Sequence, residues 1–259
     1  MLNTRNPLIS ILLPVHNSER FLLDSLKSLV SQTYRQIEII AIDDYSNDNS
    51  LKILRSFAKK YSPRGGAGKK VRVYKNVKRY GIVMTLNRLL KRAKGDYIAF
   101  MDAKDISLRQ RIKKQIAFLF DNPGVVAVGS QCRFISEKGK LLGKSSFPKE
   151  NQFIYQSPLH GISMQFETVL VNKTLLPKDV LRFKTSSYPF VYSDLFIKLF
   201  PYGKFANLSQ YLHYHRKNPQ TYFWDLRKNI ISFVKFWLLS KTNYDYHPSF
   251  SSLFLPFTS

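Results

Sequence analysis

Closely spaced charged side chains follow an apolar segment near the middle of the chain. The run Tyr97–Met101 is apolar, and Asp102, Lys104 and Asp105 come directly after it. Carboxylates in this position are typical of ligand sites, because ligands of open α/β sheets bind beyond the carboxyl ends of the strands. A divalent-metal site would be expected to carry a third carboxylate here, whereas this chain has Lys104. Any function assigned to the segment must accommodate that cation.

Two other polar loops follow apolar segments in the same way. They span residues 14–19 and residues 43–48, and neither contains the G-x-G-x-x-G of dinucleotide folds or the G-K-[ST] of a P-loop. Acidic loops of this kind suit recognition of a base, a ribose or a metal, since a carboxylate accepts hydrogen bonds from base N–H groups and ribose hydroxyls. Two carboxylates can also hold a metal that bridges a diphosphate.

Strand and helix patterns alternate through the first half of the chain, which predicts the elements that position these loops. The apolar runs predict strands at residues 8–15, 37–42, 71–74 and 97–101, and the helical spacing predicts helices at residues 18–32, 47–60, 82–93 and 108–120. This alternation predicts an α/β fold with a mostly parallel, doubly wound sheet and helices on both faces. Residues 125–134 are expected to form a further strand followed by a hairpin.

Composition limits the class of protein. Of the 259 residues 44% are hydrophobic, which is enough for a large core, and Cys132 is the only cysteine, which excludes an internal disulfide. The apolar run after the polar N-terminus is far shorter than the roughly 20 residues of a spanning helix. We therefore expect a cytoplasmic protein in a reducing compartment.

The net charge of +24 favours acidic partners. Residues 55–94 hold fourteen basic residues and no acidic one, so this segment should form a strongly positive surface. Either a solvated basic face or a surface for a polyanion or anionic membrane fits this pattern. A nucleic-acid-binding protein is an alternative that rests on charge alone, because the chain has no helix-turn-helix, zinc-finger or ribonucleoprotein signature.

Several motifs occur in the order seen in one enzyme family. They are Ile9-Ser10-Ile11-Leu12-Leu13-Pro14-Val15-His16-Asn17, Ser28-Leu29-Val30-Ser31-Gln32-Thr33-Tyr34, Ile42-Asp43-Asp44-Tyr45-Ser46-Asn47-Asp48, Lys94 to Asp102, Arg111 to Gln115, Glu167 to Val171 and Gly203 to Leu208. Together the chain from about residue 8 to 216 resembles the family-2 glycosyltransferases, which have the A-type nucleotide-sugar-binding fold. Each motif alone is weak, but their common order is specific.

The resemblance implies transfer of a sugar from a nucleotide diphosphate sugar, usually with inversion, to a hydroxyl acceptor that the sequence does not identify. A uridine diphosphate sugar is the first donor to consider, and the acceptor would be a glycan, a lipid-linked molecule or a polyanion. The resemblance assigns nucleotide binding to Pro14, His16, Glu19, Asp43, Asp44 and Asp102. For the pair Asp43 and Asp44, a capped turn at a helix start is the alternative.

Lys104 departs from the family pattern D-x-D-D, in which its position holds an acidic residue tied to the metal. A lysine ammonium about 4 Å from another cation would be repelled by roughly 4 kcal/mol per unit charge at an effective dielectric of 20. Three interpretations are open. Asp102 and Asp105 hold Mn2+ or Mg2+ while Lys104 points away, or Lys104 replaces the metal by pairing with the diphosphate, or the site has lost catalysis. Arg216 is a second candidate contact to the diphosphate.

A second departure concerns the catalytic base. The family pattern resembles E-D-x-D-L-x-L-R-L, and Val191 and Tyr192 occupy the E-D pair here. A tyrosine with a pKa near 10 is a poor base at neutral pH. Asp194 is therefore the candidate catalytic residue, and a carboxylate favoured at a helix N-terminus is its alternative interpretation. Because of both departures, a catalytically impaired nucleotide-sugar-binding protein or accessory subunit is the alternative function.

The remaining expectations concern the second half. Residues 1–220 are expected to form the transferase domain, with a nucleotide-sugar half at about 1–122 and an acceptor half at about 123–220. The aromatic extension 221–259 is expected to pack on that domain or on a membrane surface, which would place the protein at the periphery of the cytoplasmic membrane face. His160, His213 and His215 lack metal-ligand spacing and are interpreted as ordinary histidines.

Overall fold

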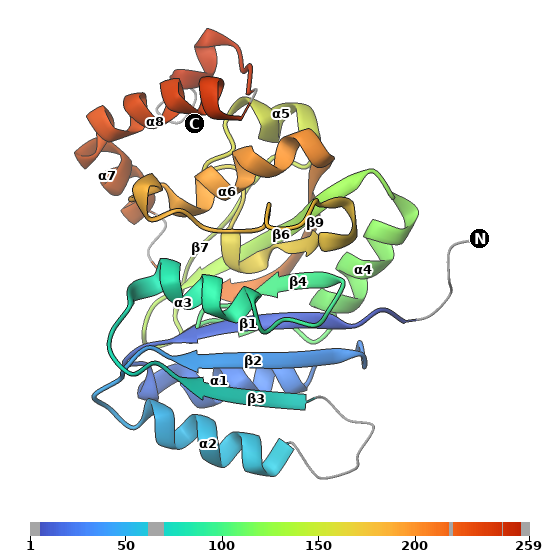
Figure 1. Ribbon diagram of the computed structural model, residues 1–259, viewed down its shortest axis with the longest axis vertical. Coiled ribbons are helices and arrows are strands. Elements are labelled where there is room, and N and C mark those ends of the chain that lie inside the picture. Colours follow the sequence, from blue (N-terminus) through green and yellow to red (C-terminus); the bar gives the residue numbers. More distant parts are fainter. Residues whose placement is uncertain (1–5, 62–69, 218–219, 245, 255–259) are drawn as a thin grey trace.

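The computed structural model describes residues 6–61, 70–217, 220–244 and 246–254 (Figure 1). Continuous apolar runs rich in isoleucine and leucine form the first strands, and amphipathic segments form the helices between them. The first elements are β1 (Ile9–Val15), α1 (Glu19–Val30), β2 (Ile37–Asp43), α2 (Ser50–Tyr61), β3 (Lys70–Lys75), α3 (Gly81–Leu90) and β4 (Tyr97–Phe100). The four strands expected from the sequence are confirmed, and no end differs from the expected one by more than one residue.

The second half adds shorter elements and two long strands. They are β5 (Ile106–Ser107), α4 (Arg111–Asp121), β6 (Val125–Ile135), β7 (Leu141–Lys144), α5 (Asn151–Gln156), the 3-10 helix η1 (Phe166–Thr168), β8 (Leu170–Asn172), α6 (Val191–Leu199), β9 (Lys204–His215), α7 (Gln220–Lys228) and α8 (Ile230–Asn243). The expected strand and hairpin after residue 125 are confirmed by β6, which pairs antiparallel with β7.

The described strands form one mixed sheet. Its order is β3-β2-β1-β4-β8-β6-β9-β5, with β7 beside β6. The first four strands are parallel, so that Ile11 lies opposite Ile39 on one side and Ala99 on the other. β8 then pairs antiparallel with both β4 and β6. The predicted doubly wound sheet is therefore confirmed, with its parallel order concentrated in the first half.

Helices cover both faces of this sheet, as predicted. Ile11 and Leu13 point to the face that is covered by α1, α2 and α4, whereas Leu12 points to the face that is covered by α3 and α6. This follows from the strand period of two, which sends alternate side chains to opposite faces. All three side chains are fully buried. The two cores hold the parallel strands rigidly, and the loops at the ends of β1, β2 and β4 meet at one edge of the sheet.

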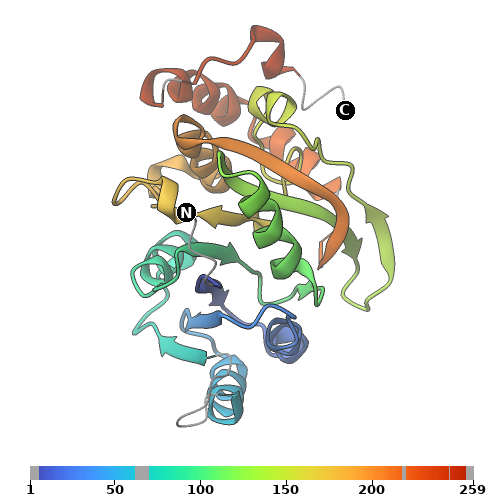
Figure 2. The same cartoon turned by 90° about the vertical axis from the view of Figure 1, so that its right-hand side faces the viewer.

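The C-terminal helices pack on the end of the molecule opposite β3 and α2 (Figures 1 and 2). Tyr222 of α7 packs against Cys132 of β6, while Leu226 of α7 and Phe233 of α8 pack around Leu159. No described helix is both long enough and apolar enough to cross a bilayer. These contacts bring Tyr222 next to the polar groups of the sheet edge.

Candidate active site

The loops after β1 and β2 are held together by reciprocal hydrogen bonds. The backbone N–H of Glu19 donates to Oδ2 of Asp48 at 3.0 Å, and the backbone N–H of Asn49 donates to Oε2 of Glu19 at 2.8 Å. Nδ1 of His16 lies 3.0 Å from the carbonyl oxygen of Asp44. The predicted nucleotide residues His16 and Glu19 therefore lie in one rigid double loop. Pro14 is half-buried and lies near the end of β1, just before this double loop.

Asp43 and Asp44 lie at the end of β2 and are both buried. Oδ1 of Asp44 accepts the backbone N–H of Tyr80 at 2.9 Å, and Oδ2 accepts the backbone N–H of Gly81 at 2.8 Å. Asp43 accepts the backbone N–H of Ser46 at 3.2 Å. The Asp44 carboxylate thus anchors the start of α3, where Gly81 has a φ of 79° that favours glycine. In this structure both carboxylates stabilise backbone turns beside the predicted nucleotide site.

Asp102 and Lys104 form a tight turn after β4. Oδ1 of Asp102 accepts the backbone N–H of Lys104 at 2.7 Å, and the Asp102 carbonyl accepts the Ser25 hydroxyl at 3.3 Å. Burial raises the pKa of Asp102, and the neighbouring Asp105 carboxylate raises it further. The Lys104 residue is exposed. The sequence-predicted pair therefore lies together at the sheet edge, with the lysine on the solvent side.

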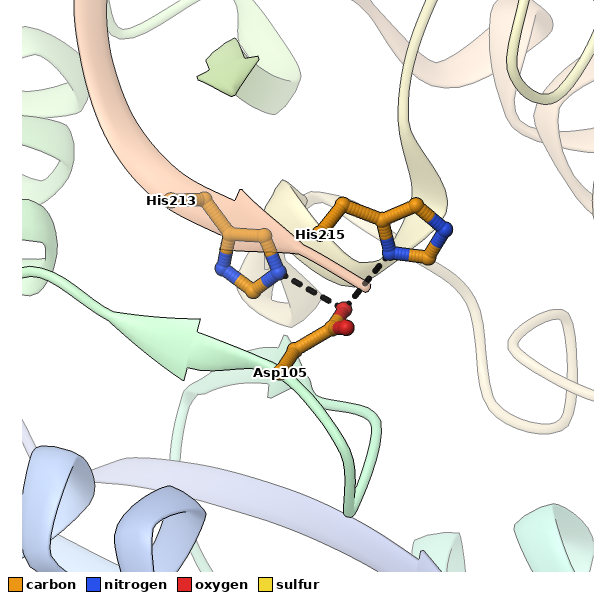
Figure 3. Close-up of side chains that lie close together, drawn as sticks. All are labelled: Asp105, His213 and His215. Carbon is orange, nitrogen blue, oxygen red and sulfur yellow. Dashed lines mark hydrogen bonds and ion pairs between the residues drawn. The ribbon is translucent and has the colours of Figure 1, made fainter. Parts of the chain in front are cut away.

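Asp105 is the centre of a buried ionic cluster (Figure 3). Its Oδ2 accepts Nε2–H of His213 at 2.8 Å and Nδ1–H of His215 at 2.7 Å, and its Oδ1 accepts the backbone N–H of Arg216 at 2.8 Å. Burial alone would lower the pKa of His215, but the Asp105 carboxylate raises it to about 9. Burial lowers the pKa of His213 to about 4. His215 is consequently the charged partner, and it holds the pKa of Asp105 well below its usual range despite burial.

The interpretation of His213 and His215 as ordinary histidines does not hold. Both side chains converge on Asp105, and the three residues could offer ligand atoms to a metal within 4.8 Å of one another. The sequence did contain a signal, because a spacing of two residues on a strand places both imidazoles on the same face. Their partner lies more than one hundred residues earlier in the chain, and β5 and β9 bring the two segments together by antiparallel pairing.

Arg216 binds backbone carbonyls with its guanidinium group. Nε donates to the carbonyl of Lys104 at 2.9 Å, and Nη1 donates to the carbonyls of Ser136 at 2.8 Å and Glu137 at 3.0 Å. The guanidinium also lies 4.5 Å from the centre of the Phe21 ring. Arg216 therefore fixes the turn that carries Lys104. The sequence predicted a contact of Arg216 with the diphosphate and did not predict this positioning role.

Tyr192 lies at one end of an aromatic stack that begins in the sheet. Phe166 of η1 stacks on Phe100 of β4 with a centroid distance of 4.2 Å, and on Tyr192 of α6 with a centroid distance of 4.1 Å. Burial raises the pKa of Tyr192 well above its ordinary value, and the nearby Glu167 and Asp102 carboxylates raise it further. The Tyr192 hydroxyl is accordingly neutral and can donate a hydrogen bond, but it is a poor base.

Asp194 has different partners. Its Oδ1 accepts the hydroxyl of Tyr244 at 2.9 Å, and its backbone N–H donates to the carbonyl of Phe190 at 2.8 Å. Among the described residues, no hydrogen bond joins Asp194 to the carboxylates at the ends of the strands. The predicted catalytic residue thus occupies the first turn of α6 and anchors the segment that follows α8.

A cavity opens beside Tyr192. It has a volume of about 330 Å³ and is lined on one side by Tyr192 and Ser193 of α6 and on the other by Lys217 and Tyr222. Nζ of Lys217 lies 4.3 Å from the centre of the Tyr222 ring. A cavity of this size accommodates a small polar ligand, and its wall offers aromatic faces, a hydroxyl and a cation.

Comparison with known proteins places the chain in a family. The family model for glycosyl transferase family 2 matches residues 10–171. EpsE of Bacillus subtilis is 35% identical over 51% of this chain and 46% of its own length. WfgD of Escherichia coli is 27% identical over 72% of this chain and 66% of its own length. WfgD is named a UDP-Glc:alpha-D-GlcNAc-diphosphoundecaprenol beta-1,3-glucosyltransferase. The chain spans about half the length of EpsE and a larger part of WfgD.

Solved structures show the same fold. S. aureus TarS in complex with UDP-GlcNAc is similar with a TM-score of 0.66 over 88% of this chain and 66% of that chain, at 18% sequence identity. The mannosyltransferase PcManGT from Pyrobaculum calidifontis, in complex with GDP-Man and Mn2+, has a TM-score of 0.67 over 90% of this chain and 64% of that chain, at 16% identity. The fold is the A-type glycosyltransferase fold, and the chain belongs to glycosyl transferase family 2.

Proposed function

We propose that the chain transfers a hexosyl unit from a nucleotide diphosphate sugar to a hydroxyl acceptor, with inversion at the anomeric carbon. The observation that carries this proposal is the meeting of polar loops at the ends of β1, β2 and β4, together with a cavity whose Lys217 directly follows the arginine that binds the β4 turn. WfgD is named for a UDP-Glc donor, and a TarS structure contains UDP-GlcNAc. A UDP-sugar is therefore the donor to test first.

In this proposal the loops after β1 and β2 bind the nucleotide. His16 offers a ring that can stack on a base, and Pro14 shapes the loop entrance. Glu19 and Asp44 already hold backbone N–H groups, so they contribute by fixing the loop shape. Because the binding elements are held before the donor arrives, little ordering free energy opposes binding.

The carboxylates after β4 do not fit an Mn2+ or Mg2+ ion that bridges a diphosphate. Both oxygens of Asp105 accept hydrogen bonds from buried donors, and one oxygen of Asp102 accepts the Lys104 N–H. Nε2 of His213 and Nδ1 of His215 both bond the same Asp105 oxygen, so these three ligand atoms satisfy one another. The Asp105, His213 and His215 group is therefore better suited to a salt bridge than to a metal.

We propose instead that Lys104 and Lys217 stabilise the departing diphosphate. Lys104 is exposed on the turn that Arg216 fixes, and Lys217 directly follows Arg216 and lines the cavity. Fixed cations placed where charge develops in the transition state are an established way to stabilise a leaving phosphate. The chain would then need no divalent ion for this step.

Nucleotide-sugar binding without turnover is the second candidate function. It is favoured by one observation, which is the neutral Tyr192 at the position where the family pattern has its base. Measurement of donor binding alone does not separate the two functions. Measurement of donor cleavage does separate them, because only a transferase releases UDP from the bound donor.

Isothermal titration calorimetry with UDP-glucose, UDP-GlcNAc and GDP-mannose tests donor binding. We expect one of them to bind with the same dissociation constant in Mn2+ and in EDTA. The Lys104→Ala variant should bind at least about tenfold more weakly, because a charge-assisted contact to phosphate contributes roughly 1.5–3 kcal/mol. The control Lys59→Ala, an exposed lysine of α2, should bind as the wild type does. Strict dependence on Mn2+ would refute the role of Lys104, and absence of any donor binding would refute the proposed function.

We also propose that α8 lies on an anionic membrane surface that presents a lipid-linked, glycan or polyanionic acceptor. Ile231 is 83% exposed and Leu238 is 55% exposed, and both belong to a mostly apolar face of α8 that also includes Lys235. The opposite face of α8 buries Phe233 and Trp237 in the protein. A helix with apolar residues on two faces needs two apolar partners, and the basic character of the chain favours an anionic lipid surface.

Flotation with vesicles tests this placement. The wild type should float with vesicles that contain phosphatidylglycerol at low salt, and less with phosphatidylcholine alone. The double variant Ile231→Ser/Leu238→Ser should lose most of the bound fraction, whereas Val77→Ser, at a residue that is 77% exposed elsewhere, should not. Equal binding by both variants would show that α8 is not the lipid-binding face.

A further inference from the structure

Glu167 is a buried carboxylate that is fixed beside the end of β4. The Arg111 guanidinium donates to the Glu167 carbonyl at 2.5 Å and to the Phe100 carbonyl at 3.5 Å. Arg111 is fully buried, so this bridge is rigid. Since Phe100 is the last residue of β4, the bridge holds η1 next to the turn that carries Asp102. The Glu167 backbone therefore has a defined position at the catalytic edge of the sheet.

The side chain of Glu167 lies close to the position where the family pattern has its base. Tyr192 occupies that position, and its ring stacks on Phe166, the immediate neighbour of Glu167. The Glu167 carboxylate is also close enough to raise the pKa of the Tyr192 hydroxyl. Its Oε2 accepts a hydrogen bond from Nε2 of Gln165, which also donates to the Tyr222 hydroxyl at 3.0 Å. Tyr192 and Tyr222 both line the cavity.

Charged groups from every surrounding element act on Glu167. Burial raises its pKa to about 7; His215 of β9 opposes this rise, and Asp105 and Asp102 add to it. Arg111 of α4 also faces it, as do Tyr222 of α7, Tyr192 of α6 and Cys132 of β6. A carboxylate with a pKa near the working pH is well matched to accept a proton, because it is half ionised there and still basic.

The other carboxylates near the cavity are committed elsewhere. Asp105 is bound by His213 and His215, Asp194 accepts the Tyr244 hydroxyl, and Asp102 accepts the Lys104 N–H. Asp225, which lines the cavity, is exposed and pairs with Nζ of Lys217 at 3.5 Å. Among these groups only Glu167 combines a partly ionised carboxyl with a place beside Tyr192. Among the described residues, its side-chain oxygen accepts from the neutral amide of Gln165 and not from a charged group.

We propose that Glu167 is the general base of the transfer reaction. This inference rests on the proposed function. The acceptor hydroxyl loses its proton to a carboxylate oxygen of Glu167 while its oxygen forms the new bond to the anomeric carbon. The bond from that carbon to the diphosphate oxygen breaks, and its electron pair leaves with the diphosphate near Lys104 and Lys217. Tyr192 keeps its proton, so its hydroxyl can donate a hydrogen bond to the bound acceptor.

Hydrolysis of the donor tests the inference without knowledge of the acceptor, because water can take the place of the hydroxyl. We would incubate the UDP-sugar that binds in calorimetry with the enzyme and measure release of UDP. Glu167→Gln should lower kcat by at least 100-fold, the usual contribution of a general base, while donor affinity stays within threefold. The control Glu150→Gln, an exposed residue before α5, should retain wild-type rates.

The pH profile separates a base from a merely structural residue. Wild-type kcat/KM should rise with pH and level off above about 7, and Glu167→Asp should keep a rising limb at a lower rate. Glu167→Gln should lose that limb. Activity of Glu167→Gln within twofold of the wild type would overturn the inference, as would donor binding by the wild type without any UDP release above background. Failure of the wild type to bind any donor would instead overturn the proposed function.

Discussion

Replacement of His215 by glutamine should destabilise the protein in a pH-dependent way. The imidazolium of His215 is buried and donates to Asp105 at 2.7 Å and lies 2.9 Å from the Tyr222 hydroxyl. Glutamine is neutral, so it leaves the Asp105 carboxylate buried without its charged partner. Loss of one member of a buried ion pair typically costs about 3–5 kcal/mol. We expect a loss of this size in the free energy of unfolding at pH 6.

The pH dependence follows from the raised pKa of His215. Because the pKa is about 9 in the folded protein and near 6.5 in the unfolded chain, the stabilisation is fully present below pH 6.5 and is lost as the pH rises through 9. Each pH unit between the two pKa values corresponds to about 1.4 kcal/mol. The stability difference between wild type and His215→Gln should therefore shrink by about 3 kcal/mol between pH 6 and pH 9.5.

Urea denaturation of both proteins at a series of pH values measures this difference. Comparison with the wild type at each pH cancels the titration of groups on which His215 does not act, such as Lys198. The control Glu137→Gln removes an exposed ion pair with Arg20 and should change stability by less than about 1 kcal/mol at any pH. A constant difference between wild type and His215→Gln from pH 6 to pH 9.5 would refute a charged His215.

Two further predictions concern backbone packing and Asp194. A Cβ at Gly95 would lie 2.6 Å from the Leu8 carbonyl oxygen, so Gly95→Ala should lower the free energy of unfolding, measured by urea denaturation, by about 1–3 kcal/mol. The control Gly124→Ala, with open space around its Cβ, should lower it little. Equal losses in the two variants would contradict this contact. Asp194→Asn should lower stability by about 1–2 kcal/mol through its bond to Tyr244 and leave UDP release within threefold of wild type. A loss of 100-fold in UDP release at unchanged donor affinity would restore Asp194 as the base.

The fold was predictable because its signal is local. Apolar runs such as Ile39–Ile42 are stable as strands between two helical layers, and the polar loops that follow parallel strands meet at the carboxyl edge. The bounds of β2, Ile37–Asp43, differ from the prediction by one residue. Residues Asp102, Lys104 and Asp105 were therefore identified as neighbours from the sequence alone.

The partners of these residues were not predictable in the same way, because they are set by distant segments. Asp105 depends on His213 and His215, which β9 delivers from the other end of the domain. Asp44 bonds the start of α3, although the helix that follows it in sequence is α2. A carboxylate's spacing in the sequence indicates that it lies at the edge of the sheet, but only the long-range pairing decides which donors occupy its oxygens.

The departures at positions 104 and 192 are linked through the charge around Glu167. A divalent ion beside Asp102 would add two positive charges and lower the pKa of Glu167, and an aspartate at position 192 would add a negative charge and raise it. This chain has Lys104 and Tyr192 at these two positions. Lys104 is exposed, where solvent screens its charge, and Tyr192 is neutral. The pKa of Glu167 is then set mainly by burial and stays near 7. In the proposed mechanism Lys104 and Tyr192 thus favour the same outcome, which is a buried carboxylate able to accept a proton at neutral pH.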